Sequence, residues 1–193
     1  MDKYGEFALT DAIRPSFDLK VVPTTGYRRE LYRDDESGAK IPVVMASASR
    51  EKLFEVFLDL IEPLGNVVDV VLESSHERDI RGHEDMYREH IDAPVLKSVL
   101  HEYEDLILND GCCGMAVLNP KIPNEVQFDE HKLLIVYGSN LEDYENILER
   151  HGVHRDDKMR FITEAEHVHS SSDSYQQLFG SLKTELGMDN EYA

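Results

Sequence analysis

Residues 41–72 read IPVVMASASREKLFEVFLDLIEPLGNVVDVVL, and this stretch predicts the fold class. Residues 41–46 and 67–72 are apolar almost throughout, as is typical of strands in the middle of a sheet. Between them, Ser49 is a helix-capping residue type, and apolar side chains recur at helical spacing as far as Pro63. A helix that connects two such strands implies a crossover and parallel pairing. The stretch therefore predicts an α/β protein.

The rest of the chain adds antiparallel strands and further helices. Strand-like runs separated by turn residues predict two β-meanders, over residues 17–46 and 112–137. Helical spacing also resumes at about Glu84. Capping residues and apolar stripes predict about four helices that cover the sheet, over residues 49–62, 94–108, 141–151 and 174–186. We therefore expect a mixed parallel and antiparallel sheet, in an α/β fold with an α+β tendency.

The order of the predicted elements repeats along the chain. Residues 41–108 and 132–187 both read strand, helix, strand, polar loop, helix, which predicts an internal pseudo-repeat, although few residues are identical. Residues 1–15 lack periodicity and are expected to form a flexible arm, and residues 188–193 a disordered polar tail. Residues 16–187 then form a single α/β domain, of a size that buries its own core.

The composition limits the partners of the protein. With 39 acidic and 20 basic residues, the formal net charge is −19, which repels nucleic-acid phosphates and anionic membranes. The same charge favours cationic partners and divalent cations, although solubility alone also explains it, and a nucleic-acid mimic is a further alternative. No apolar run approaches the roughly 20 residues of a membrane span, and the first six residues do not resemble a secretory signal. These features predict a cytoplasmic protein.

The two cysteines are adjacent, at Cys112 and Cys113. Consecutive Cα atoms lie about 3.8 Å apart across a trans peptide, closer than an unstrained disulfide prefers. On a strand, their side chains also point to opposite faces. We therefore expect two reduced thiols that act as small apolar side chains, with a vicinal redox pair as the alternative.

Polar side chains gather where predicted strands end. Ser47 and Ser49 follow one strand, and Ser139 and Asn140 follow another. Ligands of parallel sheets usually bind beyond the carboxyl ends of the strands, so these four are candidate ligand-binding residues. Ordinary helix caps and turns use the same residue types, which is the alternative interpretation.

Histidines supply a second kind of candidate site. His167 and His169 share one face of a predicted strand, a spacing that suits zinc or a similar divalent metal. Glu164 and Glu166 point to the other face of a regular strand, so a carboxylate ligand requires a bend in the strand. Further candidate metal ligands lie in the polar loop after an earlier strand: His76 and His83.

No sequence motif identifies a reaction, so the sequence leaves open whether the protein is an enzyme. Motifs for phosphate loops, dinucleotide binding, serine hydrolases and zinc proteases are all absent from the sequence. The leading hypothesis is a non-catalytic binding or regulatory module that contacts proteins or small ligands, and whose exposed edge strands pair in a homo-oligomer. The alternative is a metal-assisted hydrolase, or another small-molecule enzyme, with His and Glu groups at the strand ends.

Overall fold

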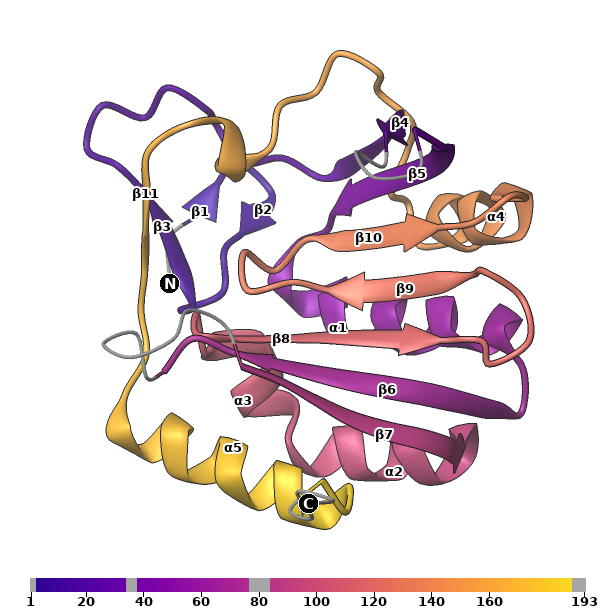
Figure 1. Ribbon diagram of the computed structural model, residues 1–193. Coiled ribbons are helices and arrows are strands. Elements are labelled where there is room, and N and C mark those ends of the chain that lie inside the picture. The colour runs from indigo at the N-terminus through magenta and orange to yellow at the C-terminus, as the bar shows by residue number, and fades with distance from the viewer. Residues whose placement is uncertain (1–2, 34–37, 77–83, 189–193) are drawn as a thin grey trace.

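The computed structural model describes residues 3–33, 38–76 and 84–188, and its centre is a seven-stranded sheet (Figure 1). Hydrogen bonds join every neighbouring pair of these strands in antiparallel register. From one edge to the other, the strands are β4 (Gly26–Arg33), β5 (Lys40–Ser47), β10 (Leu134–Tyr137), β9 (Glu125–Phe128), β8 (Cys113–Leu118), β6 (Val67–Ser74) and β7 (Glu84–Asp92).

The expected parallel pairing is wrong, because β5 and β6 are not neighbours in the sheet. They do run in the same direction, as a crossover through α1 (Arg50–Ile61) requires, because four antiparallel steps separate them. The strands β8, β9 and β10 lie between them, with β10 paired to β5 and β8 paired to β6. The apolar spacing thus predicts the crossover between β5 and β6. Which strands these two pair with depends on β8, β9 and β10, which come later in the chain. The sheet is antiparallel throughout rather than mixed.

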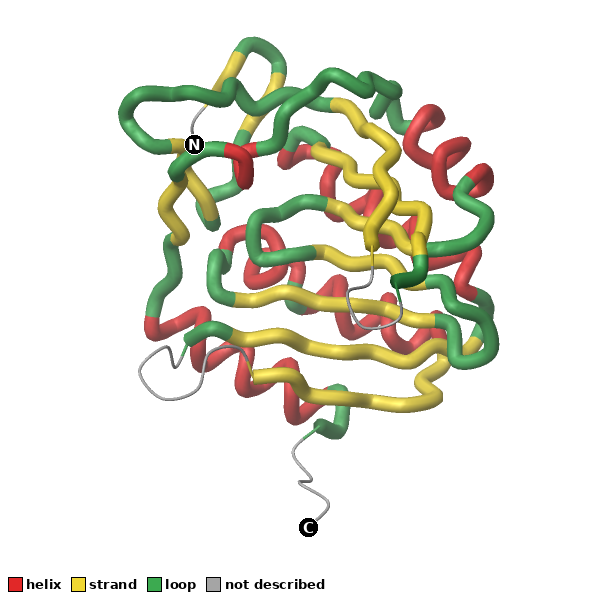
Figure 2. Tube along the Cα trace, turned by 45° about the horizontal axis from the view of Figure 1, so that its top comes forward, coloured by secondary structure: helices red, strands yellow, loops and turns green. Residues whose placement is uncertain are grey.

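All four predicted helical segments are helical in the structure, although Tyr103 divides residues 94–108 into two helices. After α1, the helices are α2 (Ala93–Glu102), α3 (Glu104–Asn109), α4 (Glu142–Arg150) and α5 (Asp173–Glu185). Two short 3₁₀ helices are η1 (Glu62–Leu64) and η2 (Ile162–Glu164). In Figures 1 and 2 the helices α1, α2 and α3 lie on one side of the large sheet.

The main core lies between these helices and one face of the sheet. Helix α1 is apolar on most sides and buries seven side chains, among them Phe57, whose ring packs edge to face on Phe128 with 5.1 Å between centroids. Truncation of such a buried ring costs about 3–5 kcal/mol of stability. Along β6 buried residues alternate with more exposed ones, so helices cover one face of this strand rather than the two faces expected for residues 67–72.

The segment predicted as an arm contains three short strands, β1 (Lys3–Tyr4), β2 (Phe7–Ala8) and β3 (Ile13–Pro15). Strand β1 pairs with β2, and β3 pairs with β11 (His167–His169) near the other end of the described chain. Phe7, Ile13 and Ile162 are buried together in a small second core. Strands of two or three residues are too short to show an alternation, so they could not be predicted from the residue pattern.

Several local predictions are also wrong. The helical spacing near Glu84 belongs to strand β7, and residues 17–22 and 159–163 form no strand. The second strands of the expected pseudo-repeat, β6 and β11, lie in different sheets, so the two halves are not arranged alike. Within the described ranges, none of the helices is both long and apolar enough to span a lipid bilayer.

Candidate metal centre

Three histidines from two separate segments of the chain lie together beside the end of the large sheet. His131 lies in the turn between β9 and β10, and His167 and His169 begin and end β11. The ring centroids lie 4.8 to 5.2 Å apart in all three pairs. One potential ligand nitrogen from each ring lies within 4.8 Å of the other two. All three rings are partly exposed, so ions and water reach them from solvent.

The pairing of β11 with β3 places two of these rings on one face. In antiparallel register His167 lies opposite Pro15 and His169 opposite Ile13. Alternation along the strand turns Val168 to solvent, where it is 59% exposed, and both histidines toward His131. The predicted common face of His167 and His169 is therefore confirmed.

A close approach of three backbone segments fixes the end of β11. The Ser170 N–H donates to Ala12 O at 2.8 Å, and the Gly111 N–H donates to Ser170 O at 2.8 Å. A Cβ atom on Gly111 would lie only 2.2 Å from Ala12 O. Glycine is therefore required at this position, because any side chain would push the segments apart.

A tight turn presents the third ring. Asp129 accepts hydrogen bonds from the backbone N–H groups of Lys132 and Leu133, the latter at Oδ1 over 2.7 Å. Lys132 adopts a left-handed φ of 61°, and this reverses the chain into β10. Sequence reasoning missed His131, because residues 129–131 have the composition of an ordinary hairpin connector. No spacing in the sequence relates this turn to β11.

Hydrogen bonds fix the same tautomer in all three rings. Nδ1 of His131 lies 2.9 Å from Asp129 Oδ2, Nδ1 of His167 lies 2.8 Å from Ala165 O, and Nδ1 of His169 lies 2.7 Å from Gly111 O. An ionised carboxylate and a backbone carbonyl only accept hydrogen bonds, so each Nδ1 must carry the proton. The neutral rings therefore each keep a lone pair on Nε2. Metal-bound histidines in proteins show this arrangement almost without exception.

The surroundings shift the pKa values of His169 and His131 in opposite directions. Burial lowers the pKa of His169, which keeps this ring neutral and ready to bind a cation. Burial also acts to lower the pKa of His131, but the hydrogen bond and charge of Asp129, with the charge of Glu130, outweigh it and raise that pKa. Glu130 is itself held in place by the Ser75 hydroxyl, which donates to Oε2 at 3.2 Å. The site thus has the carboxylate of Glu130 beside it. None of the described hydrogen bonds joins this carboxylate to the three rings.

The other predicted metal ligands do not join this cluster. His76 lies instead beside Asp110, with Nε2 2.8 Å from Oδ2, and His83 lies outside the described residues. Glu164 pairs with Arg28 at 2.8 Å and accepts from Phe161 N–H at 3.1 Å. The exposed Glu166 offers its backbone oxygen to Ser16 N–H at 2.9 Å.

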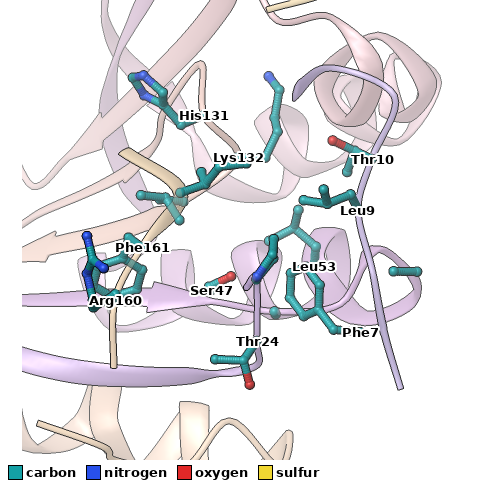
Figure 3. Close-up of a pocket in the computed structure, with 15 residues that line it drawn as sticks. Phe7, Leu9, Thr10, Thr24, Ser47, Leu53, His131, Lys132, Arg160 and Phe161 are labelled. Atoms are coloured by element: carbon teal, nitrogen blue, oxygen red, sulfur yellow. The ribbon is translucent and has the colours of Figure 1, made fainter. Parts of the chain in front are cut away.

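The four candidate ligand-binding residues do not line one common pocket. Ser49 Oγ accepts from the buried Ala8 N–H at 2.9 Å, and Asn140 Oδ1 accepts from the first N–H of α4, that of Glu142, at 3.2 Å. Ser47 lines a cavity of about 20 Å³, and Ser139 lines a larger groove. Figure 3 shows the residues around the small cavity, with His131 at one edge of the group. A cavity of this size holds about one water molecule and no substrate.

The chemistry of the three rings is the firmest guide to a function for this chain. Three imidazoles, one from a turn and two from a strand, are the ligand set of some catalytic zinc sites, in which a water molecule takes the open position. The same ligands also suit copper, iron or nickel. Comparisons with protein-family models, with curated proteins and with solved structures give no match to this chain.

Proposed function

We propose that the protein binds one zinc-class transition-metal ion through His131, His167 and His169, and that this ion activates water for hydrolysis. The single observation that carries the proposal is the shared tautomer, because each Nδ1 faces an acceptor and each Nε2 is left with a lone pair. Zinc–nitrogen bonds are about 2.0–2.1 Å long, so the donor nitrogens, which lie within 4.8 Å of one another, would have to move closer together to bind one ion. The net charge of −19 attracts cations to the site.

An open coordination position gives the ion its chemistry. Zinc held by three histidines lowers the pKa of a bound water to about 7, which supplies a hydroxide nucleophile near neutral pH. An ion held by these three histidines would supply the nucleophile for cleavage of a carboxylic or phosphoric ester into an acid and an alcohol. Glu130 would accept the proton that the water loses and return it to the departing alkoxide, because its charge acts on both His131 and His169.

Metal binding is tested on the full chain, purified without a histidine tag. Elemental analysis and titration of zinc against a coloured chelator are compared for wild type and for His131→Ala, His167→Ala and His169→Ala. Loss of a residue that orients a metal ligand weakens metal affinity roughly 10- to 100-fold. Each of these variants lacks a ligand itself, so its zinc affinity is expected to fall by more than this. His154→Ala is the matched control, because this ring is exposed and pairs with Glu149 away from the site. Wild-type affinity in all three site variants would overturn the proposal.

Hydrolysis is tested separately with nitrophenyl acetate and bis(nitrophenyl) phosphate on metal-loaded protein. The rate is expected to rise as the pH passes about 7, where the bound water ionises. Glu130→Gln is expected to keep the metal and lower the rate by roughly 10²- to 10⁴-fold, the usual contribution of a general base. Tight metal binding without hydrolysis of either ester would remove the enzymatic part and leave a metal-binding module.

A groove favours a second candidate function, the binding of a small ligand or peptide without catalysis. Its volume is about 650 Å³, within the range of about 300–1,000 Å³ of ligand pockets. It is lined by apolar and aromatic side chains and a few polar ones, including Tyr32, Ile41, Ile122, Tyr137, Gln127 and Ser139. A screen for ligands that raise the Tm tests it, with Ile122→Arg to block the groove and Val95→Arg on α2 as the control.

The edge of the sheet supports a proposal of self-association. Strand β4 is an edge strand of the large sheet, and its Leu31 and Tyr32 are 65% and 51% exposed. Exposed apolar edge strands tend to pair with another copy of the same chain. The second predicted meander, over residues 112–137, supplies only inner strands of the sheet. Sedimentation is expected to show a dimer that Leu31→Lys converts to a monomer, and a monomeric wild type would contradict the proposal.

A further inference from the structure

A second cluster of metal-ligand side chains lies where β6 ends and β8 begins. Ser74 lies opposite Cys113 in the antiparallel register of these strands, so the following His76 reaches the segment before β8. This brings His76, Asp110 and Cys112 together, with one donor atom from each within 4.8 Å of the other two. The set differs from the three-histidine cluster, because it includes a thiol and a carboxylate.

His76 and Asp110 form a buried pair in this second cluster. Asp110 is fully buried, and the side chain of His76 is 6% exposed. His76 Nε2 lies 2.8 Å from Asp110 Oδ2, and neither atom has a further hydrogen-bond partner among the residues that the structure describes. The burial of two charged groups costs free energy that a single contact between them offsets only in part. A cation that replaces the proton between Nε2 and Oδ2 would be held by both atoms.

The surrounding contacts prepare the three side chains as ligands. Burial acts to raise the pKa of Asp110, but the neighbouring His76 and Ser171 side chains and the Cys112 N–H outweigh it, so the pKa is lowered and the carboxylate is ionised. The Cys112 N–H donates to Asp110 Oδ1 at 3.2 Å, which turns Oδ2 toward His76. His76 Nδ1 lies 2.8 Å from Ser74 Oγ, and this hydroxyl oxygen can accept a hydrogen bond from Nδ1–H while Nε2 binds a metal.

The two cysteines have opposite environments. Cys113 is buried, and burial raises the pKa of its thiol to about 12. It lies within 3.9 Å of the oxygens of Leu106 and Asp110, so its sulfur faces backbone carbonyls. Cys112 is partly exposed and lies beside a histidine and a carboxylate. Of the two thiols, Cys112 alone is placed to become a metal thiolate.

We propose that His76, Asp110 and Cys112 bind a second transition-metal ion, of the zinc class, through imidazole, carboxylate and thiolate. This donor set suits zinc, for which cysteine, histidine and acidic ligands are all common. The site shares no ligand with the three-histidine centre. With both sites filled, the protein holds two ions per chain.

Cobalt(II) tests this inference on the tag-free full chain, because cobalt replaces zinc and shows its ligands by absorption. Wild-type protein is expected to take up two equivalents and to show a thiolate-to-cobalt charge-transfer band in the near ultraviolet. Cys112→Ser is expected to remove this band and one equivalent, whereas Cys113→Ala keeps both. His167→Ala combined with His169→Ala is expected to remove the other equivalent and keep the band, which separates this site from the proposed hydrolytic centre.

Two results would overturn the second site. One is wild-type protein without a charge-transfer band at saturating cobalt. The other is a band that survives Cys112→Ser. Because Cys112 is partly exposed, the serine variant is expected to fold, and circular dichroism with a thermal melt checks it.

Discussion

The two ligand clusters differ in how their hydrogen bonds are met. In the three-histidine cluster every Nδ1 faces an acceptor and the rings are partly exposed, so the ligands are oriented before an ion arrives. In the second cluster the side chains of His76 and Asp110 are buried, and His76 Nε2 and Asp110 Oδ2 have only each other as partners among the described residues. The first arrangement suits an ion that exchanges water with solvent, as in catalysis, and the second suits an ion that completes the interior.

The clusters nevertheless meet in one short segment. Gly111 O accepts from His169 Nδ1 in the first cluster, and Asp110 and Cys112 on either side of it belong to the second. A change in this segment is therefore expected to affect both clusters. Changes elsewhere are expected to affect one of them.

The largest expected effect is the loss of a whole ion from one cluster. The double variant His167→Ala, His169→Ala lacks two of the three proposed ligands of the three-histidine cluster. It keeps all of the proposed ligands of the second cluster. Zinc bound per chain, measured by elemental analysis after dialysis, is expected to fall from two equivalents to one. A fall to zero would show that the clusters do not bind independently, and no fall would show that the exposed cluster binds no metal.

The next largest effect is expected from a substitution that disturbs both clusters at once. Gly111→Ala places a Cβ atom 2.2 Å from Ala12 O, so the segments that meet there must separate. The free energy of unfolding is expected to fall by about 1–3 kcal/mol, with weaker zinc binding in both clusters. Denaturant unfolding measures this. Gly180→Ala in α5 is the control, because its Cβ meets nothing within 4 Å, and it is expected to stabilise the protein by about 0.5–1 kcal/mol.

A smaller effect is expected from Asp129→Asn, which changes one tautomer. The Asn Oδ1 still accepts from Leu133 N–H, so the amide NH₂ replaces Oδ2 beside His131 Nδ1. Nδ1 must then accept, and the proton moves to Nε2, the metal-binding atom. Zinc affinity of the exposed cluster is expected to fall roughly 10- to 100-fold in the chelator titration. Asp156→Asn, in another exposed turn, should leave it unchanged, and equal affinity in the two variants would contradict the tautomer argument.

The smallest effect concerns the thiols. Because the pKa of Cys113 is about 12, only about one in ten thousand of its thiols is ionised at pH 8. Iodoacetamide is therefore expected to modify Cys112 and spare Cys113, and zinc is expected to slow the modification of Cys112. Peptide mass spectrometry measures both. A rate that zinc does not change would count against Cys112 as a ligand, and preferential modification of Cys113 would contradict the assigned burial.

Patterns within one element predicted more of this molecule than relations between elements. Helical spacing located the helices, and the alternation of His167 and His169 predicted their common face. It did not predict His131 as their partner, because a hairpin turn and the β3–β11 pairing bring that ring to them. In the same way, the spacing around α1 implied the direction of β5 and β6 but not the three strands between them. The sequence predicted His76 as a candidate metal ligand but not its neighbour Asp110, to which the register of β6 with β8 brings it.

The pairing of β3 with β11 is expected to make the three-histidine cluster form late in folding. Its hydrogen bonds join residues 13–15 to residues 167–169, which lie near the two ends of the described chain. Contacts between residues far apart in sequence form slowly, because loop closure costs entropy before the contact gives anything in return. A metal ion that binds there binds the folded chain and holds β11 in place. Partly folded molecules, with β11 still free, are then expected to leave synthesis without this ion, and its occupancy becomes a measure of how many molecules have completed their fold.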